Sequence, residues 1–475
     1  MQRYDVAVIG AGVTGAAIAR TLSQYRIRLA LIEAREDIAM GASRANSAIV
    51  HAGYDCVPGT LMARLNVEGN RLYDEWAAQL DVPLKRIGSL VIAIGAEQDA
   101  AVKALYERGI ENGVPGMKIL SGEEARAMEP SLSEEVTSAL YASTGAITCP
   151  YEMTIACAEN ARMNGCDWLM NFPAEKIEKR DGVFVLTGGG RSIEAEYIVN
   201  AAGVYADDVA RLIGDDSFVI RPRKGEYLLM DHGSNDIRTV IFQTPSKLGK
   251  GVLVSPTVDG NVFAGPTAVD GEDKADTSVS QESIDMLKKQ ACLSVPALNF
   301  RQVITQFAGV RAQPEPHDFI LRASEKDPHF IHAAGICSPG LSSAPAISYV
   351  IRDLLKEAGL ALEKKPDHDP TRKAIRAFRH MTDAERAAAI KEDPLYARVI
   401  CRCETITEAE IVEAVRRGAR SIDGVKRRTR AGMGRCQGGF CQQKILELLA
   451  RETGTAPEAV CLDAPGSNPL LGPLG

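Results

Sequence analysis

The chain has 475 residues, which is too long for one ordinary domain and indicates two or three. Its net charge is −7 at pH 7, so it lacks the basic balance that a nucleic-acid partner needs. Hydrophobic residues make up 45% of the chain, which is enough to build packed cores. These bulk properties indicate a globular protein and exclude a nucleic-acid-binding one.

The start of the chain and its cysteines indicate where the protein works. A strand pattern begins directly after Met1, and no apolar run reaches the length that crosses a membrane. Eleven cysteines without a secretory signal favour a reducing compartment, and metal or redox use over disulfides. We therefore expect a cytoplasmic protein, with peripheral attachment to the inner membrane through a partner left open.

The first element is a nucleotide-binding motif. Residues 6–9 form an apolar run typical of a buried parallel strand, and Gly10, Gly12 and Gly15 follow it as G-x-G-x-x-G before a helix expected over 16–22. Such glycines let a pyrophosphate approach backbone N–H groups at a helix N-terminus. A second strand, 29–32, ends at Glu33, whose carboxylate can accept hydrogen bonds from an adenosine ribose. The motif predicts a dinucleotide and does not separate NAD from FAD.

Two later strands end in the same Ala-Ala-Gly sequence. They span residues 198–203 and 330–336, and the second precedes a loop and helix start at 337–346. With the glycine loop, these stretches resemble the D-amino-acid-oxidase-like (glycine-oxidase-like) family of FAD proteins over roughly residues 1–358. The resemblance implies FAD, with the last loop along its isoalloxazine ring. The cofactor-binding residues it implies are Gly10, Gly12, Gly15, Glu33, Ser43, Asn46, Ser47, Ala202, Gly203, Gly335, Gly340, Leu341 and Ser342.

The stretch at residues 43–59 makes the resemblance more specific. It contains Ser47, the sequence His51-Ala52-Gly53 and a Pro-Gly turn. It resembles FAD-dependent glycerol-3-phosphate dehydrogenases, particularly the soluble oxidases and the anaerobic large subunit, and also 2-hydroxyglutarate dehydrogenases. Oxidation of a secondary alcohol releases a hydride to the flavin and a proton from the hydroxyl, and histidine titrates near neutrality. The resemblance implies His51 as this base, with Ser47 beside the flavin. A histidine satisfied by backbone bonds, or one bonded covalently to the flavin, are the alternatives.

Two cations are candidates for binding an anionic substrate. Arg311 lies where the family often places a substrate-binding arginine, and its planar fork suits carboxylate and phosphate alike. Lys250 precedes a strand expected at 252–254 and is a second candidate, although a solvated turn lysine explains it equally well. Arg311 therefore predicts an anionic substrate without selecting one.

Four cysteines near the C-terminus form a metal-ligand pattern. Cys401 and Cys403 form C-x-C, and Cys436 and Cys441 form C-x-x-x-x-C. We expect them in loops and at a helix start, within a unit whose helices span 407–416 (with a capping box), 421–429 and 438–451. The pattern resembles the bacterioferritin-associated-ferredoxin-like [2Fe–2S] domain, also present in the anaerobic large subunit; structural zinc is the competing interpretation. The cluster would carry negative charge, which nearby arginines would offset: Arg427, Arg428, Arg430 and Arg435.

The expected fold class is an α/β FAD-binding Rossmann-like domain interleaved with an α+β substrate domain, plus a small helical [2Fe–2S] C-terminal domain. The predicted ranges are 1–85, 141–221 and 321–358 for the FAD domain, 86–140 and 222–320 for the substrate domain, 359–395 for a linker with one helix over 383–391, 396–455 for the cluster domain and 456–475 for a tail.

The resemblances imply an FAD-dependent dehydrogenase that oxidises sn-glycerol 3-phosphate to dihydroxyacetone phosphate. Electrons would pass from FAD through the [2Fe–2S] cluster to an acceptor protein or subunit, for which a second flavoprotein is one candidate. A 2-hydroxyacid or amino-acid dehydrogenase on the same frame is one alternative, and an electron-transfer subunit without its own substrate is another. Homo- or hetero-oligomerisation is left open.

Overall fold

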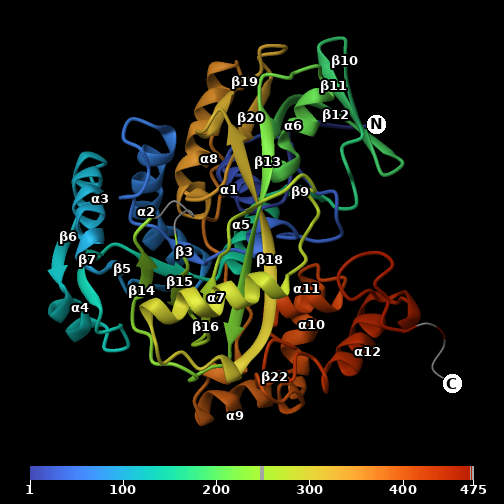
Figure 1. The fold of residues 1–475 in the computed structure, drawn as a ribbon. Helices are drawn as coiled ribbons and strands as arrows, with labels where there is room; N and C mark the ends of the chain where they lie inside the picture. Colours follow the sequence, from blue (N-terminus) through green and yellow to red (C-terminus); the bar gives the residue numbers. More distant parts are fainter. Residues whose placement is uncertain (246–250, 471, 473–475) are drawn as a thin grey trace. The chain divides into compact units, whose positions relative to one another are not determined.

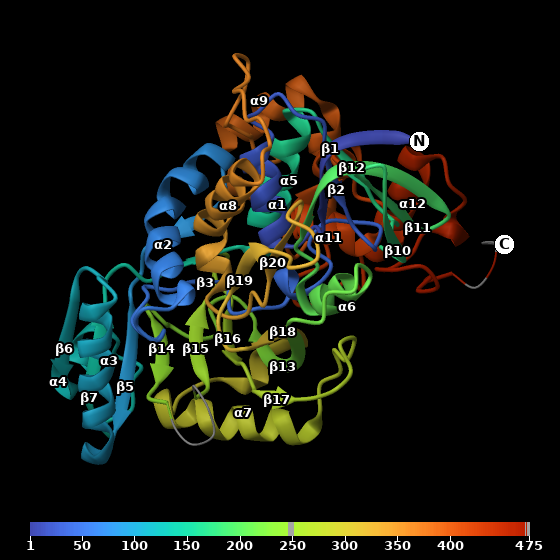
Figure 2. The same cartoon turned by 90° about the horizontal axis from the view of Figure 1, so that it is seen from above.

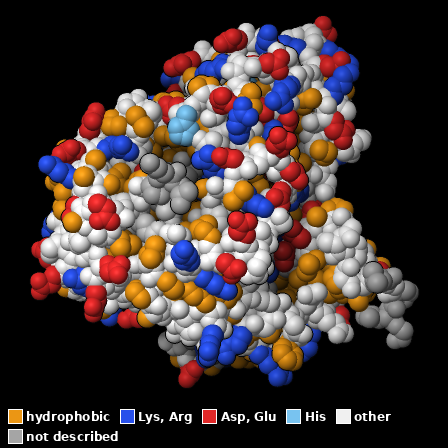
Figure 3. Space-filling view, viewed as in Figure 1, with side chains coloured by type: hydrophobic (Ala, Val, Ile, Leu, Met, Phe, Trp, Pro, Cys, Tyr) orange, Lys and Arg blue, Asp and Glu red, His pale blue; other side chains and the backbone are white. Residues whose placement is uncertain are grey.

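The computed structural model describes residues 1–245, 251–470 and 472. Contacts divide the chain into two compact units (Figure 1). The first contains Met1–Ala34 and Ala39–Arg372, and the second contains Arg35–Ile38 and Lys373–Gly475. Within the described residues, no helix combines the length and the apolar character needed to span a membrane. On the face in Figure 3, basic and acidic side chains are interspersed and neither sign gathers into a broad patch.

The first unit contains a mainly parallel sheet centred on β1 (Gln2–Ile9). β1 pairs in parallel with β2 (Leu29–Ile32) and β12 (Arg191–Asn200), and β20 (Phe330–Ala334) extends the parallel set beyond β12. The remaining strands are β9 (Cys166–Leu169), β10 (Lys176–Arg180), β11 (Val183–Gly188) and β19 (Ile320–Ala323). The predicted strand at 29–32 is confirmed with the same bounds, and the first strand begins four residues before its predicted start.

Four helices accompany this sheet. They are α1 (Val13–Leu22), α2 (Leu61–Leu80), α5 (Pro150–Met163) and α8 (Gly340–Glu357). α1 packs against both α5 and α8, and α2 lies beside α8 in both views (Figures 1 and 2). A short helix, α6 (Ala206–Arg211), follows the 3-10 turn η3 (Gly203–Tyr205) at the end of β12. The predicted α1 and α8 therefore exist, whereas the long α2 was not predicted.

A second sheet has the order β17–β13–β16–β15–β14–β5–β7–β6, with β18 paired along β13. Its strands are β5 (Ser89–Ile94), β6 (Met117–Ser121), β7 (Val136–Ala142), β13 (Val219–Met230), β14 (Val240–Gln243), β15 (Leu253–Pro256), β16 (Val262–Gly265), β17 (Val269–Asp270) and β18 (Val303–Glu315). Figure 2 shows α7 (Gln281–Ser294) lying along this sheet, and its Leu287 and Ala291 pack into the core with Leu228 and Val254. α3 (Asp99–Glu111) and α4 (Gly122–Met128) pack on β6 and β7.

Short elements connect the two sheets. β3 (Ile49–Val50), β8 (Ala146–Thr148) and β4 (Leu84–Lys85) form a three-stranded sheet, and His51 follows β3 directly. Besides η3, the 3-10 turns of this unit are η1 (Ala42–Arg44), η2 (Ala96–Gln98) and η4 (Phe300–Gln302). Arg372, at the end of the unit, donates from Nε to a Glu159 carboxylate oxygen at 2.7 Å, with both side chains buried. Residues up to Arg372 are thus fixed to the first unit, although they fall within the predicted linker range.

The second unit is mainly helical. Its elements are η5 (Phe378–His380), α9 (Asp383–Glu392), η6 (Pro394–Ala397), β21 (Val399–Cys401), β22 (Ile406–Thr407), α10 (Glu408–Arg416), α11 (Ile422–Thr429), α12 (Gln442–Thr453) and η7 (Pro457–Ala459). The capping box predicted for α10 is confirmed, with Thr407 and Glu410 bonding reciprocally. The predicted start of α12 at Gly438 is wrong, because Gln437 and Gly438 have φ of 47° and 88° and the helix begins at Gln442.

Candidate functional site

The N-terminal glycines allow three elements to approach each other closely. Gly10 has φ 103°, and a Cβ there would lie 2.3 Å from the Ala201 carbonyl oxygen. A Cβ on Gly15 would lie 1.8 Å from the Gly10 carbonyl oxygen. Gly12 is the N-cap of α1 and offers no side-chain acceptor, and the first turn of α1 has no carboxylate. The start of α1 is therefore suited to an anion.

The other residues predicted around the cofactor gather at one edge of the parallel sheet. Because β1, β12 and β20 run parallel, their carboxyl ends lie at the same edge. This arrangement brings the glycine loop together with Ala202, Gly203 and Gly335. Glu33 also points here, since its Oε2 accepts a hydrogen bond from the Ala11 N–H at 2.9 Å.

The loop after η1 is fixed by its own polar side chains. The Asn46 side chain donates to two carbonyls of the preceding turn and accepts from the backbone N–H two residues on. Ser43 Oγ accepts from the Val13 N–H at 2.8 Å, and Ser47 Oγ lies 3.1 Å from the Tyr227 hydroxyl. Asn46, predicted to bind the cofactor, therefore shapes the loop, while Ser43 and Ser47 connect it to α1 and β13.

The backbone of His51 is held from both sides. Its N–H donates to Ser342 Oγ at 2.7 Å, and its carbonyl accepts from the Asn66 and Asn70 amides of α2 at 3.1 and 2.8 Å. The imidazole lies 5.4 Å from the Phe242 ring, centre to centre. The Ser342 hydroxyl, predicted to be at the cofactor, thus positions His51. The second residue of α8 is fixed too, because the Tyr73 hydroxyl donates to the Leu341 carbonyl at 2.7 Å.

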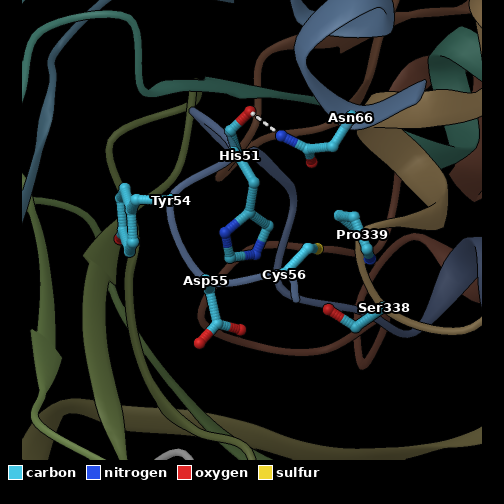
Figure 4. A pocket seen from close by; sticks show the side chains of 8 residues that line it. His51, Tyr54, Asp55, Cys56, Asn66, Ser338 and Pro339 are labelled. Atoms are coloured by element: carbon cyan, nitrogen blue, oxygen red, sulfur yellow. Dashed lines mark hydrogen bonds between the residues drawn. The ribbon is translucent and has the colours of Figure 1, made fainter. Parts of the chain in front are cut away.

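A small pocket borders the His51 side chain. Figure 4 shows the imidazole in the middle of the group, with the Asp55 side chain below it and the Cys56 side chain beside it. The lining residues are His51, Gly53, Tyr54, Asp55, Cys56, Asn66, Ser338 and Pro339. Ser338 and Pro339 belong to the loop predicted to lie along the isoalloxazine ring. The structure thus brings the predicted base and the predicted flavin loop to one pocket.

Arg311 lies across the neighbouring strand β13. Its Nη2 donates to the carbonyls of Thr267 at 2.6 Å and Lys224 at 3.3 Å, and its Nε donates to the Arg223 carbonyl at 3.4 Å. Burial lowers the pKa of the Arg311 guanidinium, and the nearby Arg223 charge lowers it further. The other predicted cation, Lys250, lies outside the described residues.

Tyr227 is a site residue that the sequence reasoning missed. Its ring is buried and stacks on Phe307, with centres 4.7 Å apart and planes 12° apart. Burial raises the pKa of Tyr227, whereas Arg311 and the Ser47 hydrogen bond lower it. The sequence does contain a signal for it. Residues 223–227 read Arg-x-Gly-x-Tyr and residues 307–311 read Phe-x-Gly-x-Arg, and in an antiparallel pair such reversed patterns can place like residues opposite each other.

The four C-terminal cysteines lie close together in the second unit. The Cys403 sulfur is 3.8 Å from that of Cys401 and 3.7 Å from that of Cys436. Hydrogen bonding from Cys441, followed by backbone N–H groups, lowers the pKa of Cys401 to about 5. Cys401 is the last residue of β21, so its predicted loop position is wrong, whereas Cys441 is the N-cap of α12. No group of three or more His, Cys, Asp or Glu side chains among residues 1–245, 251–470 and 472 surrounds a single metal ion.

Three of the four arginines near the cysteines form ion pairs with buried carboxylates. Arg427 and Arg428 donate to the buried Asp37 carboxylate at 2.9 and 2.6 Å, and Arg430 pairs with the buried Glu404 at 2.9 Å. Carboxylates therefore bond to all three of these arginines, and the expectation that they also offset the charge of a cluster stays a prediction.

Residues 5–354 match the FAD dependent oxidoreductase family. The chain belongs to this family. Residues 399–451 match the BFD-like [2Fe-2S] binding domain. A glycerol 3-phosphate dehydrogenase of Caloramator mitchellensis is 46% identical over 473 residues, covering 99% of this chain and 98% of the relative. One subunit of the anaerobic glycerol-3-phosphate dehydrogenase of Escherichia coli K12 is 27% identical, covering 95% and 88%. The structure of dithionite-reduced, FAD-bound L-alpha-glycerophosphate oxidase of Mycoplasma pneumoniae has a TM-score of 0.75 at 32% identity, covering 78% of this chain and 99% of that one.

As an FAD dependent oxidoreductase, the protein binds FAD, and the residues present fit that cofactor. Gly10, Gly12 and Gly15 leave room for a pyrophosphate at the start of α1, whose N-cap Gly12 has no side chain, and the Glu33 carboxylate lies at the same loop. Ser338 and Pro339, of the loop predicted to lie along the flavin ring, line the same pocket as His51.

The second unit carries a [2Fe–2S] cluster, and its thiols fit one. Sulfur separations of 3.7 and 3.8 Å match the edge of a tetrahedron with metal–sulfur bonds of about 2.3 Å. A two-iron cluster shares four thiolates between two irons, so the four sulfurs need not converge on one point. Phe440, next to Cys441, has 85% of its surface exposed, which places an aromatic ring at the rim of the cysteine loop.

Proposed function

We propose that this FAD dependent oxidoreductase oxidises sn-glycerol 3-phosphate to dihydroxyacetone phosphate and passes the electrons through its [2Fe–2S] cluster to a partner protein. The observation that carries the proposal is the 46% identity, across 99% of the chain, to a glycerol 3-phosphate dehydrogenase. Because another relative is one subunit of an anaerobic glycerol-3-phosphate dehydrogenase, we infer that the acceptor is a separate polypeptide.

In this proposal His51 is the general base. Its backbone N–H donates to Ser342 Oγ and its carbonyl accepts from the Asn66 and Asn70 amides, so the point from which the imidazole extends into the pocket is fixed. The substrate hydroxyl gives its proton to the imidazole as the carbonyl forms, and the hydrogen on the same carbon leaves with its electron pair. Bound FAD supplies the acceptor for that hydride, and the cluster accepts electrons one at a time.

Arg311 is the proposed anchor for the phosphate. Its Nη2 already donates to the Thr267 and Lys224 carbonyls, which fixes the guanidinium plane. A fixed planar fork can offer two parallel hydrogen bonds to phosphate oxygens. Lys250 stays a prediction as a second cation.

Anaerobic reduction of the bound flavin tests the substrate. The purified holoenzyme is mixed with glycerol 3-phosphate, L-2-hydroxyglutarate, glycine or glycerol, and bleaching of the flavin absorbance is followed. We expect rapid bleaching with glycerol 3-phosphate alone. If the hydroxyacid or the amino acid bleached the flavin instead, that compound's class would be assigned as the substrate. No bleaching by any of the four would favour an electron-transfer subunit without its own substrate.

A further inference from the structure

A second guanidinium lies beside Arg311. In the antiparallel pairing of β13 with β18, Arg223 is directly opposite Arg311, and Tyr227 is directly opposite Phe307. Directly opposite residues project from the same face of a sheet, as do residues two apart on one strand. Arg223, Tyr227 and Arg311 therefore share one face of this two-stranded ribbon.

Close packing shows where this face points. A Cβ on Gly309 would lie 2.0 Å from the Ala45 carbonyl oxygen, and the Tyr227 hydroxyl lies 3.1 Å from Ser47 Oγ. The face thus packs against the loop predicted to lie beside the flavin. A Cβ on Gly225 would lie 3.1 Å from Arg311 Nη2, so the missing side chain leaves the space in which the guanidinium lies.

A second loop, residues 337–339, is the one predicted to lie along the flavin ring. The Asp270 hydrogen bond raises the pKa of Arg223 and burial lowers that of Arg311, and an interaction with Cys337 makes a smaller contribution that raises both pKa values. Cys337 directly precedes Ser338 and Pro339, which line the His51 pocket.

An acidic residue completes a row across three strands. Asp270 of β17 lies opposite Arg223, and its two carboxylate oxygens accept from Arg223 Nε at 2.5 Å and Nη2 at 2.9 Å. Its side chain is 71% exposed, whereas that of Arg223 is 39% exposed. An exposed ion pair of this kind contributes little stability and is easily exchanged for another anion.

We propose that Arg223 is a second phosphate-binding residue, which together with Arg311 selects a dianionic phosphate over a carboxylate, and that Asp270 occupies Arg223 until the phosphate binds. This inference rests on the proposed function for its substrate. Two adjacent guanidiniums repel each other unless an anion lies between them. A phosphomonoester carries about −1.5 to −2 charges at pH 7 and three acceptor oxygens, which suits two guanidiniums. A carboxylate has one charge and is satisfied by a single fork.

Anion binding to the full-length holoenzyme tests the proposal without turnover. Calorimetry with inorganic phosphate and with glycerate is compared for the wild type, Arg223→Gln and a matched control, Arg221→Gln. Arg221 is on the same strand and face, opposite Gln313, and pairs with Glu315 at 2.8 Å. Arg223→Gln should weaken phosphate binding by about ten- to a hundredfold, the worth of one charged hydrogen-bonding partner, and glycerate binding by less than about threefold.

Asp270→Asn provides the opposite change. Removing the competing carboxylate should tighten phosphate binding severalfold while FAD content stays at the wild-type level. The proposal is overturned if Arg223→Gln binds phosphate as Arg221→Gln does, if it weakens both anions equally, or if Asp270→Asn leaves phosphate affinity unchanged. A wild type that binds phosphate but is not reduced by glycerol 3-phosphate would refute the proposed function and leave the Arg223 result standing.

Discussion

The site residues depend on partners that are remote in the chain. His51 is fixed through its backbone by Ser342 and by two asparagines of α2, and Ser47 meets Tyr227 across 180 positions. A side chain placed in this way can be truncated without dismantling the loop that carries it. Removal of the imidazole should therefore test its chemical role without disturbing the surrounding structure.

His51→Ala should slow anaerobic flavin reduction at saturating glycerol 3-phosphate by roughly two to four orders of magnitude, the usual contribution of a positioned general base. FAD content should not change, because the glycine loop and Glu33 are untouched. Stopped-flow absorbance measures the rate, and denaturation followed by cofactor quantification measures FAD. Reduction at the wild-type rate would contradict the assignment of His51 as base.

The sequence predicted some residues of the site and not others. His51 and Arg311 were predicted because their local motifs resemble those of a family. Arg223 and Tyr227 were missed because each looks like an ordinary strand residue, and only the pairing of β13 with β18 makes them neighbours of Arg311. That pairing joins residues about 90 positions apart and leaves no local pattern beyond the alternation within each strand.

At the scale of elements, prediction succeeded where periodicity and capping act locally. β2 has the predicted bounds, and α10 begins at its predicted capping box. The start of α12 was misplaced because residues with positive φ in the cysteine loop delay the helix. α2 was not predicted, and its importance lies in its contact with α8: a Cβ on Gly69 would lie 2.1 Å from the Ser342 carbonyl oxygen.

Gly69→Val should force α2 away from α8. Overpacking at such a contact costs about 1–3 kcal/mol, so the denaturant midpoint should fall. Flavin reduction should slow as well, because Ser342 holds the His51 N–H. Glu68→Val is the matched control, since it adds the same side chain at the neighbouring exposed position of α2. Equal stability of the two variants would show that the helices can separate without cost.

At the scale of the whole molecule, the chain combines two redox centres in two units. The first half-reaction needs FAD and the base, all within the first unit, whereas the cluster cysteines belong to the second. Cys436→Ser should therefore lose the [2Fe–2S] cluster and retain flavin reduction by substrate. Iron and acid-labile sulfide are assayed after anaerobic purification, alongside stopped-flow reduction. Stoichiometric zinc without sulfide in the wild type, or loss of flavin reduction in the variant, would contradict this division of roles.

The second unit also contains a buried ionic group that joins distant parts of the sequence. Burial would raise the pKa of Asp37, but Arg428 and Arg427 together hold it below its ordinary value. A depressed pKa gives stability that is complete above the ordinary pKa of about 3.9 and is lost only as the pH falls through the lower folded value. The carboxylate should therefore contribute equally at pH 5.5 and pH 8.

Asp37→Asn should lower the stability of the second unit by about 3–5 kcal/mol, because it removes the buried carboxylate that both Arg427 and Arg428 bond. Denaturant unfolding followed by the visible absorbance of the cluster measures the change, which should be the same at pH 5.5 and pH 8. Asp463→Asn is the control. Asp463 is 23% exposed and lies 3.3 Å from Arg427, so this substitution should lower the stability of the second unit by less than about 1 kcal/mol. Matching losses in the two variants would refute the special role of Asp37.

Arg35–Ile38 belong to the second unit, although the residues on either side of them belong to the first. This assignment limits where the chain can be cut to express the second unit alone. A cut before Lys373 does not release the complete second unit, because Asp37 stays with the other fragment. A fragment that starts at Lys373 would bury Arg427 and Arg428 without their carboxylate, and it would also lack the fully buried Ile38. A chimaera that exchanges the cluster module must therefore exchange these four N-terminal residues with it, so the module boundary is discontinuous in the sequence.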